Sequence, residues 1–109
     1  MASPRYFTVE EATAALPEVE RLLERLRELT ADAVDAKDAL EAVMEDLDSI
    51  GCVVRDLDLG LVDFPALAGG TELFLCWRLG EDAIGYWHGT AEGYTGRKPL
   101  RLLPGGHFH

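Results

Sequence analysis

The sequence has few of the features that mark secreted, membrane or nucleic-acid-binding proteins. It contains only two cysteines, Cys52 and Cys76, and no CxxC pair. Without a signal-peptide pattern, this predicts a reduced, cytoplasmic protein. No apolar run approaches the ~20 residues that a transmembrane helix needs. Basic residues number 10 against 20 acidic ones, giving a net charge of −10, so repulsion from phosphate argues against nucleic acids and anionic membranes as partners.

The composition otherwise indicates one folded domain. Hydrophobic residues make up 48% and charged residues 28% of 109 residues, values typical of a globular chain of single-domain length. Residues 1–50 carry 13 acidic and 5 basic side chains, against 7 and 5 in residues 51–109. The negative charge therefore belongs to the first half. We expect a single domain over residues 1–109, with a helical half (8–50), a β-rich half (52–103) and a tail (104–109).

Capping and spacing signals predict the helices of the first half. Thr8 and Glu11 fit a capping box, and Pro17 disfavours a helical conformation just before it. We therefore expect a short helix over 9–15 and a new helix that starts at Pro17. From there apolar residues recur at alternating spacings of three and four, and Gly51 is placed to end the helix. This heptad seam comprises Val19, Leu22, Leu26, Leu29, Ala33, Ala36, Leu40, Val43, Leu47 and Ile50.

Two structures satisfy this seam. A continuous helix would need a partner to cover its leucine face, and the unbroken register favours it, which leads us to expect a homodimer. A helical hairpin that turns near residues 30–32 would bury the same face within one chain. The weakening of the seam to Ala33 and Ala36 permits this second structure.

After Gly51 the pattern changes to that of β-strands. Turn residues separate short apolar runs, which indicates an antiparallel meander of four to five strands. The expected strands are 52–57, 61–64 (stopped by Pro65), 72–79, 83–88 and an edge strand over 100–103. The fold class is therefore α+β. The expected core comprises Leu22, Leu26, Leu40, Val43, Leu47, Val62, Phe64, Leu75, Trp77 and Trp87.

Several motifs spread along the chain resemble a prokaryotic domain-of-unknown-function family, number 2203. They are Phe7–Ala12 with Leu16-Pro17, Asp56-Leu57, Gly60–Pro65, Leu75–Glu81, Tyr86–His88 and Gly96–Leu100. The resemblance runs in order across residues 6–100 and implies no established activity, substrate or cofactor. This chain has a shorter helical region than that pattern, and Thr13 stands where the pattern has asparagine.

A divalent-metal site is the first hypothesis about chemistry. Asp56, Asp63, Cys76, Glu81 and His88 are metal-ligand types on or near neighbouring strands. A tight hairpin of 72–79 with 83–89 would place Cys76 opposite Trp87 and so on the face away from His88. That register disfavours a Cys–His zinc site and leaves Asp63, Glu81 and His88 as the metal candidates. The plainer interpretation is that the acids shape turns and His88 is a hydrogen-bonded structural residue.

Acid–base catalysis is the second hypothesis. His88 oriented by Asp63 or Glu11 would form a common catalytic pairing. Aromatic residues would supply an apolar wall, although such residues in strands most often belong to the core.

Anion binding is the third hypothesis. The loop Gly93–Lys98 combines glycines with two cationic side chains, Arg97 and Lys98, that could hold a phosphate or carboxylate. Tyr86 and Trp87 would complete this ligand site. The plainer interpretation of this loop is a turn whose glycines allow positive φ angles.

Together these patterns predict a dimeric binding or interaction module that holds a small, anionic ligand in its β half. The alternative is an enzyme centred on His88, metal-dependent or using a carboxylate as its acid–base partner.

Overall fold

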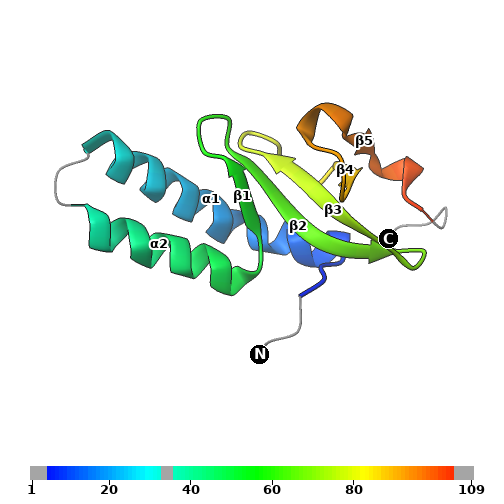
Figure 1. Ribbon diagram of the computed structural model, residues 1–109, viewed down its shortest axis with the longest axis horizontal. Helices are drawn as coiled ribbons and strands as arrows, with labels where there is room; N and C mark the ends of the chain where they lie inside the picture. Colours follow the sequence, from blue (N-terminus) through cyan, green and yellow to red (C-terminus); the bar gives the residue numbers. More distant parts are fainter. Residues whose placement is uncertain (1–4, 33–35, 105–109) are drawn as a thin grey trace.

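The structure, a computed structural model that describes residues 5–32 and 36–104, is an α+β domain. Two helices form a hairpin that leads into a five-stranded antiparallel sheet (Figure 1). The strands lie in the sheet in the order in which they follow one another in the chain, as the sequence predicted. The elements are α1 (Val9–Asp32), α2 (Lys37–Ile50), β1 (Val53–Asp56), β2 (Leu61–Ala68), β3 (Thr71–Arg78), β4 (Tyr86–Gly89), β5 (Lys98–Pro99), and the 3-10 turns η1 (Tyr94–Gly96) and η2 (Leu100–Leu102).

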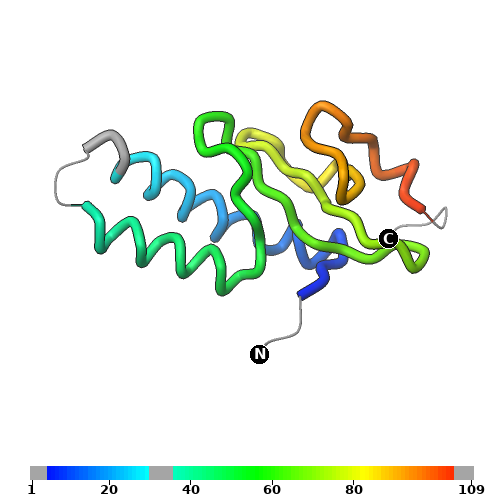
Figure 2. The backbone as a smooth tube through the Cα atoms, in the orientation of Figure 1, coloured from blue at the N-terminus to red at the C-terminus, as the bar shows by residue number. Residues whose placement is uncertain are grey.

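The helical half is a hairpin and not a single rod. The backbone tube in Figure 2 shows α2 running back alongside α1. Leu22 and Leu26 of α1 and Leu47 of α2 are buried in one common core, so the seam is covered within one chain. The turn comes later than residues 30–32, between Asp32 and Lys37, and Ala33 lies outside the described residues. Because the seam is already covered, the main reason for expecting a homodimer no longer applies, and the homodimer stays a prediction.

The first helix does not stop before Pro17, which corrects the expectation of a short helix over 9–15. α1 is continuous from Val9 to Asp32, with Pro17 in its interior. Pro17 is exposed, whereas Leu16 and Val19 are buried in the core on either side of it. Burial of these two side chains outweighs the helix propensity lost at Pro17, since packing of an apolar face supplies most helical stability in proteins.

Both ends of the hairpin follow their sequence signals. The Thr8 N–H donates to Glu11 Oε1 at 2.9 Å, and the Glu11 N–H donates to Thr8 Oγ1 at 3.0 Å. The capping box is therefore confirmed. Gly51 ends α2 with a φ of 101° and donates its N–H to the Leu47 carbonyl, a left-handed conformation that glycine adopts without steric cost.

The second strand also continues past its expected end. β2 runs from Leu61 to Ala68 through Pro65, which pairs with Phe74 of β3. The Pro65 carbonyl accepts the Phe7 N–H at 2.7 Å. Pro65 therefore directs its backbone away from β3, to the side where β1 has already ended, and its missing N–H costs no hydrogen bond within the sheet.

The last two strands are shorter than expected. β4 begins at Tyr86 and not at residue 83, and β5 is a two-residue strand at Lys98–Pro99. The expected edge strand over 100–103 is a 3-10 turn instead, in which the Leu103 N–H donates to the Leu100 carbonyl. Leu100 and Leu103 are nevertheless buried against the core.

The expected core is confirmed. Nine of its ten predicted residues are buried, and Leu40 packs partly buried against them. Val62, Phe64, Leu75, Trp77 and Trp87 alternate with polar positions along their strands and face the helices. Neither helix in residues 5–32 and 36–104 combines the length and apolar character needed to cross a bilayer.

Replacing Pro17 with alanine should stabilise the protein. The change restores a helical N–H and a better helix former at an exposed position, so the free energy of unfolding should rise by roughly 1–3 kcal/mol. Urea unfolding measures it, with Glu20→Ala, at another exposed position of α1, as a control expected to change little. Equal or lower stability of the Pro17→Ala variant would show that proline suits this site.

Candidate metal centre

The register between β3 and β4 decides which polar groups meet. Cys76 pairs with Tyr86, and His88 pairs with Phe74. The predicted register, with Cys76 opposite Trp87, was wrong by one residue. The two strands are joined by residues 79–85 and not by a tight turn at 80–82. Because side chains alternate along a strand, a shift of one residue moves His88 to the same face of the sheet as Cys76.

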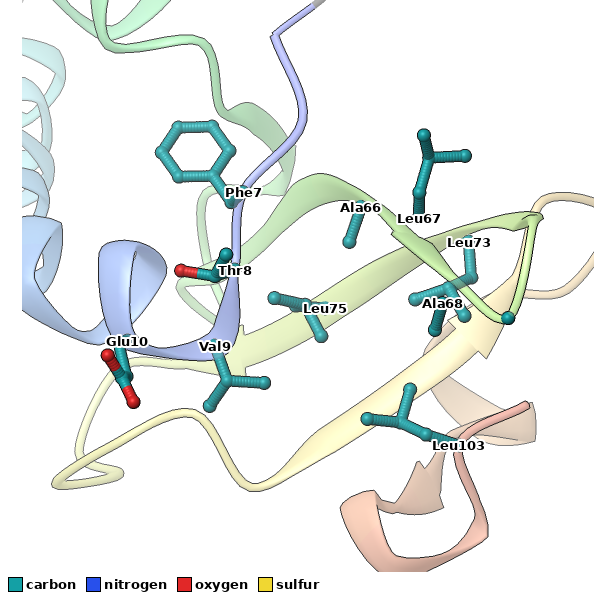
Figure 3. Close-up of a pocket in the computed structure, with 11 residues that line it drawn as sticks. Phe7, Thr8, Val9, Glu10, Ala66, Leu67, Ala68, Leu73, Leu75 and Leu103 are labelled. Carbon is teal, nitrogen blue, oxygen red and sulfur yellow. The ribbon is translucent and has the colours of Figure 1, made fainter. Parts of the chain in front are cut away.

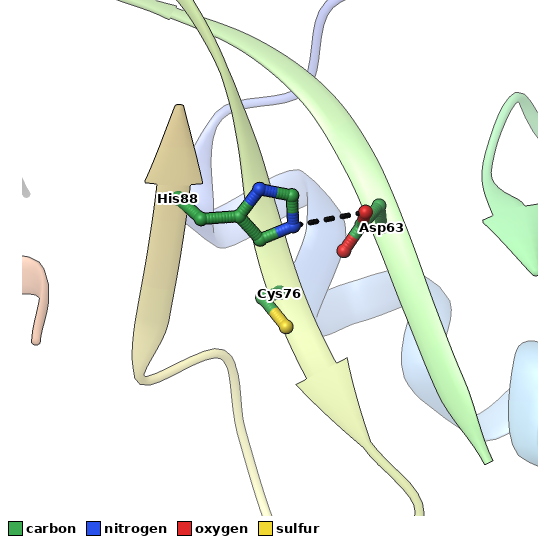
Figure 4. A group of neighbouring side chains, drawn as sticks. All are labelled: Asp63, Cys76 and His88. Carbon is green, nitrogen blue, oxygen red and sulfur yellow. Dashed lines mark hydrogen bonds and ion pairs between the residues drawn. The ribbon is translucent and has the colours of Figure 1, made fainter. Parts of the chain in front are cut away.

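Three buried side chains gather on the face of the sheet that points away from the helices. Asp63 from β2, Cys76 from β3 and His88 from β4 each offer one ligand atom, and these atoms lie within 4.8 Å of one another. Figure 4 shows the His88 ring reaching across β3 toward Asp63, with Cys76 beside it. Each residue is at most 2% exposed, which is rare for a carboxylate and an imidazole unless they are paired.

The hydrogen bonds of His88 fix its tautomer. Nδ1 lies 2.9 Å from the Gly89 carbonyl oxygen, which can only accept, so Nδ1 carries a proton and donates. Nε2 lies 2.9 Å from Asp63 Oδ2. Between an imidazole nitrogen and a carboxylate oxygen there must be either a proton or another cation, because both atoms otherwise present lone pairs.

Asp63 is also bound by an arginine. Arg55 Nε donates to Asp63 Oδ2 at 2.8 Å, and the Arg55 guanidinium lies over the Phe74 ring at 4.8 Å from its centroid. The Arg55 side chain is 46% exposed while that of Asp63 is 2% exposed. Arg55 thus neutralises a buried carboxylate from the solvent side and fixes its orientation.

Cys76 is a protonated thiol in this environment. Burial, with a smaller contribution from the negative charge of Asp63, raises its pKa to about 11. The Arg97 guanidinium lies close enough to the thiol to oppose part of this shift. Such a cysteine is a poor nucleophile at neutral pH, but a metal ion can displace the thiol proton outright.

A cavity opens beside the three residues. It has a volume of about 360 Å³ and is bounded by the strands on one side and the loop after β4 on the other. Its lining comprises Arg55, Asp56, Leu61, Asp63, Cys76, His88, Thr90, Glu92, Gly93 and Tyr94. The arrangement therefore places potential ligand atoms where a small molecule could reach them.

Glu92 holds the loop that forms the outer wall of this cavity. Its Oε1 accepts the Gly89 N–H at 2.9 Å and the Lys98 ammonium at 2.8 Å, and these bonds hold the pKa of the Glu92 carboxyl below its usual value. A Cβ atom added at Gly96 would lie 3.2 Å from Glu92 Oε2. Close packing around one carboxylate thus fixes the wall.

Glu81, a predicted metal ligand, lies outside the group of three. Its carboxylate binds Arg97 through both oxygens, at 2.8 and 3.1 Å, and accepts the Arg78 N–H at 2.7 Å. The Arg97 guanidinium lies over the rings of Tyr86 and Tyr94, at 3.9 and 4.6 Å from their centroids. Glu81 therefore positions Arg97 and is not one of the three grouped residues.

The remaining predicted site residues lie outside the group of Asp63, Cys76 and His88. Glu11 caps α1, and the hydrogen bond from the Thr8 N–H lowers its pKa, so Asp63 is the carboxylate that orients His88. Lys98 pairs with Glu92 and lies over the Trp87 ring. Trp87 faces the core with 8% exposure, while Tyr86 is 36% exposed.

Sequence reasoning missed two residues of the site. Cys76 was set aside because of the assumed register, and Arg55 was not considered. Arg55 follows Val53, the partner of Asp63, by two positions, but the register of the β1–β2 pair shifts between Val54 and Asp56. Residue spacing alone therefore does not place Arg55 beside Asp63.

A second cavity is apolar. It has a volume of about 370 Å³ and lies between the start of α1, the β2–β3 hairpin and Leu103 (Figure 3). Its polar side chains are Thr8 and Glu10, from the start of the helix. The Thr8 hydroxyl already accepts the Glu11 N–H, whereas three buried ligand-type side chains converge on the cavity beside His88. The cavity beside His88 is therefore the better candidate.

The chain is thus an α+β domain that holds a buried Asp–Cys–His group on the outer face of its sheet. It belongs to domain-of-unknown-function family 2203, whose model, described as an uncharacterized conserved protein, matches residues 28–100. The resemblance read from its motifs is confirmed. Searches of curated proteins and of solved structures give no match.

Exchanging Glu81 for glutamine should destabilise the fold. The change removes the charge that pairs with the largely buried Arg97, so the free energy of unfolding should fall by about 1–3 kcal/mol. Urea denaturation provides the measurement. Glu18→Gln is the matched control, because the Glu18–Arg21 pair is exposed and such pairs contribute little. Equal effects of the two substitutions would contradict this role for Glu81.

Proposed function

We propose that this domain binds a transition-metal ion of the Zn²⁺ class through Asp63, Cys76 and His88. The observation that carries the proposal is the orientation of His88. The Nδ1–H donates to the Gly89 carbonyl, so Nε2, 2.9 Å from Asp63 Oδ2 and close to Cys76, is the ring nitrogen left to bind a cation between these residues. In metal-binding histidines, the N–H of the ring nitrogen that does not bind the metal characteristically donates a hydrogen bond to a group such as a backbone carbonyl.

Charge balance is compatible with a bound ion. Without a metal, a proton lies between Nε2 and Asp63 Oδ2, beside the Arg55 guanidinium on the same carboxylate oxygen. A divalent ion would replace this proton and the Cys76 thiol proton. Metal binding would therefore leave the total charge of the buried group, Arg55 included, unchanged, and would add no uncompensated charge to the interior.

The ligand set favours zinc over harder ions. One nitrogen, one sulfur and one carboxylate oxygen are the donors that Zn²⁺ takes, while Mg²⁺ and Ca²⁺ prefer oxygen alone. Three protein ligands leave one tetrahedral position for a water molecule or a substrate, the arrangement of catalytic rather than structural zinc sites. The cavity of about 360 Å³ lies beside these residues.

This proposal joins the two functions predicted from the sequence. The domain is a binding module for a metal ion, and an ion with an open position would supply Lewis-acid chemistry or an activated water. Acid–base catalysis by His88 and Asp63 alone has less support, because both ring nitrogens of His88 already have partners. Homodimer formation remains a separate prediction.

Metal binding can be tested with cobalt as the probe. Purified protein loaded with Co²⁺ should hold about one ion per chain and show the thiolate-to-cobalt absorption band that a cysteine ligand produces. Cys76→Ser should lose that band, and His88→Ala should bind Co²⁺ at least tenfold more weakly. Elemental analysis after gel filtration gives the stoichiometry, and circular dichroism establishes that each variant is folded.

Two controls make this test specific. Cys52 is also buried but packs in the core and contacts the Leu47 carbonyl, so Cys52→Ser should keep the absorption band. A variant with His107→Ala and His109→Ala removes metal binding by the tail. Failure of the native protein to take up more cobalt than its Cys76→Ser variant, both folded, would refute the proposal.

A further inference from the structure

Arg55 is the basic residue that lines the cavity beside Asp63, Cys76 and His88. In the described part of the chain its hydrogen bonds use Nε alone, on Asp63, which leaves the two terminal nitrogens for another partner. The guanidinium also lies over the Phe74 ring, with its carbon 4.8 Å from the ring centroid. A guanidinium held in this way presents a preformed pair of donors, whose geometry matches that of a carboxylate or phosphate.

Arg97 and Lys98, the two cations that the sequence singled out, are already neutralised. Arg78 also reaches the cavity wall, where its Nη1 donates to the Tyr94 hydroxyl. Arg97 is bound by both oxygens of Glu81, and Lys98 is bound by Glu92. The predicted anion site at Arg97 and Lys98 therefore has its charges occupied. This contrast separates Arg55 from the basic residues that the sequence singled out.

The wall opposite Arg55 supplies hydroxyl groups. Tyr94 and Thr90 line the cavity from the loop after β4. The Tyr94 oxygen accepts the Arg78 Nη1–H at 3.1 Å, so the hydrogen of this hydroxyl remains to be donated. Of the two acids on the rim of the lining, Glu92 is neutralised by Lys98, while Asp56 accepts the Leu59 N–H and keeps its charge.

We infer that the cavity takes a small oxyanion, a carboxylate or phosphate group, between the open position of the metal and the Arg55 guanidinium. One anion oxygen would bind the metal, and Arg55 with Tyr94 would hold the others. This inference rests on the proposed metal site, because the ion completes the positive side of the pocket. The volume of about 360 Å³ lies near the lower limit of small-molecule sites and suits a metabolite-sized ligand.

The test uses the full chain loaded with Co²⁺, whose absorption changes when an anion enters its coordination sphere. Acetate and inorganic phosphate are the probes, and acetamide is the neutral analogue of acetate. We expect saturable spectral changes with either anion and none with acetamide. Arg55→Gln should weaken anion binding by about tenfold or more, since it removes a charged hydrogen-bonding partner. Arg55→Lys keeps the positive charge but loses the paired N–H donors of the guanidinium, so its affinity for anions should lie between that of the native protein and that of Arg55→Gln.

Two features keep the outcomes separate. Because Arg55 also contacts Asp63, anion titrations are compared only in samples whose thiolate band shows full cobalt loading. Arg101→Gln removes the same charge at an exposed position and should leave anion binding unchanged. A loaded native protein that does not respond to anions, or an Arg55→Gln variant that binds them as well, overturns this inference alone. A native protein that takes up no cobalt overturns the metal site as well.

Discussion

The pairing of β3 with β4 is the constraint on which the β half depends. It sets Cys76 opposite Tyr86 and His88 opposite Phe74, and so decides which side chains face the helices and which face outward. With this register Trp87 and Leu75 complete the dry core. The same register brings the imidazole over β3 to the carboxylate of Asp63. Stability and chemistry in this half are therefore two consequences of one alignment.

The two faces of the sheet bury different kinds of side chain. The inner face is apolar and is covered by the helical hairpin, so its side chains need no hydrogen-bond or ion-pair partners. The outer face is covered by the loop after β4, and its buried groups are polar. Burial of those groups requires pairing, which Arg55 provides for Asp63, and the Gly89 carbonyl for His88. The loop itself is fixed by Glu92 and by Arg97, which lies over the Tyr86 ring.

Much of the fold could be predicted because it follows from local patterns. The capping box, the glycine that ends α2 and the alternation along the strands depend on residues close together in the sequence, and the structure agrees with these predictions. Pro17 and Pro65 misled the prediction because each lacks a backbone N–H. At Pro17, burial of the neighbouring side chains compensates for the missing hydrogen bond. At Pro65, the backbone faces a side of the sheet that has no partner strand, so no hydrogen bond is lost there. A sequence does not state which side of a strand is unpartnered.

The site was predicted only in part, because it depends on register. Asp63 and His88 were recognised as ligand types, and they do meet. Cys76 was assigned to the wrong face, since residues 79–85 contain several turn signals and the sequence does not fix where the strand resumes. Glu81 was chosen as a metal-ligand type near neighbouring strands, but its carboxylate pairs with Arg97. The spacing of residues in the sequence does not show which distant charges will pair in the fold.

The helical hairpin projects past the end of the sheet, with the end of α1 and the start of α2 farthest from the strands (Figure 1). Its outer portion packs helix on helix. Adding a heptad to each helix would continue the alternating seam while leaving the inner turns in place. The arm can therefore change length between relatives without disturbing the pocket, and its reach and its chemistry are free to evolve independently.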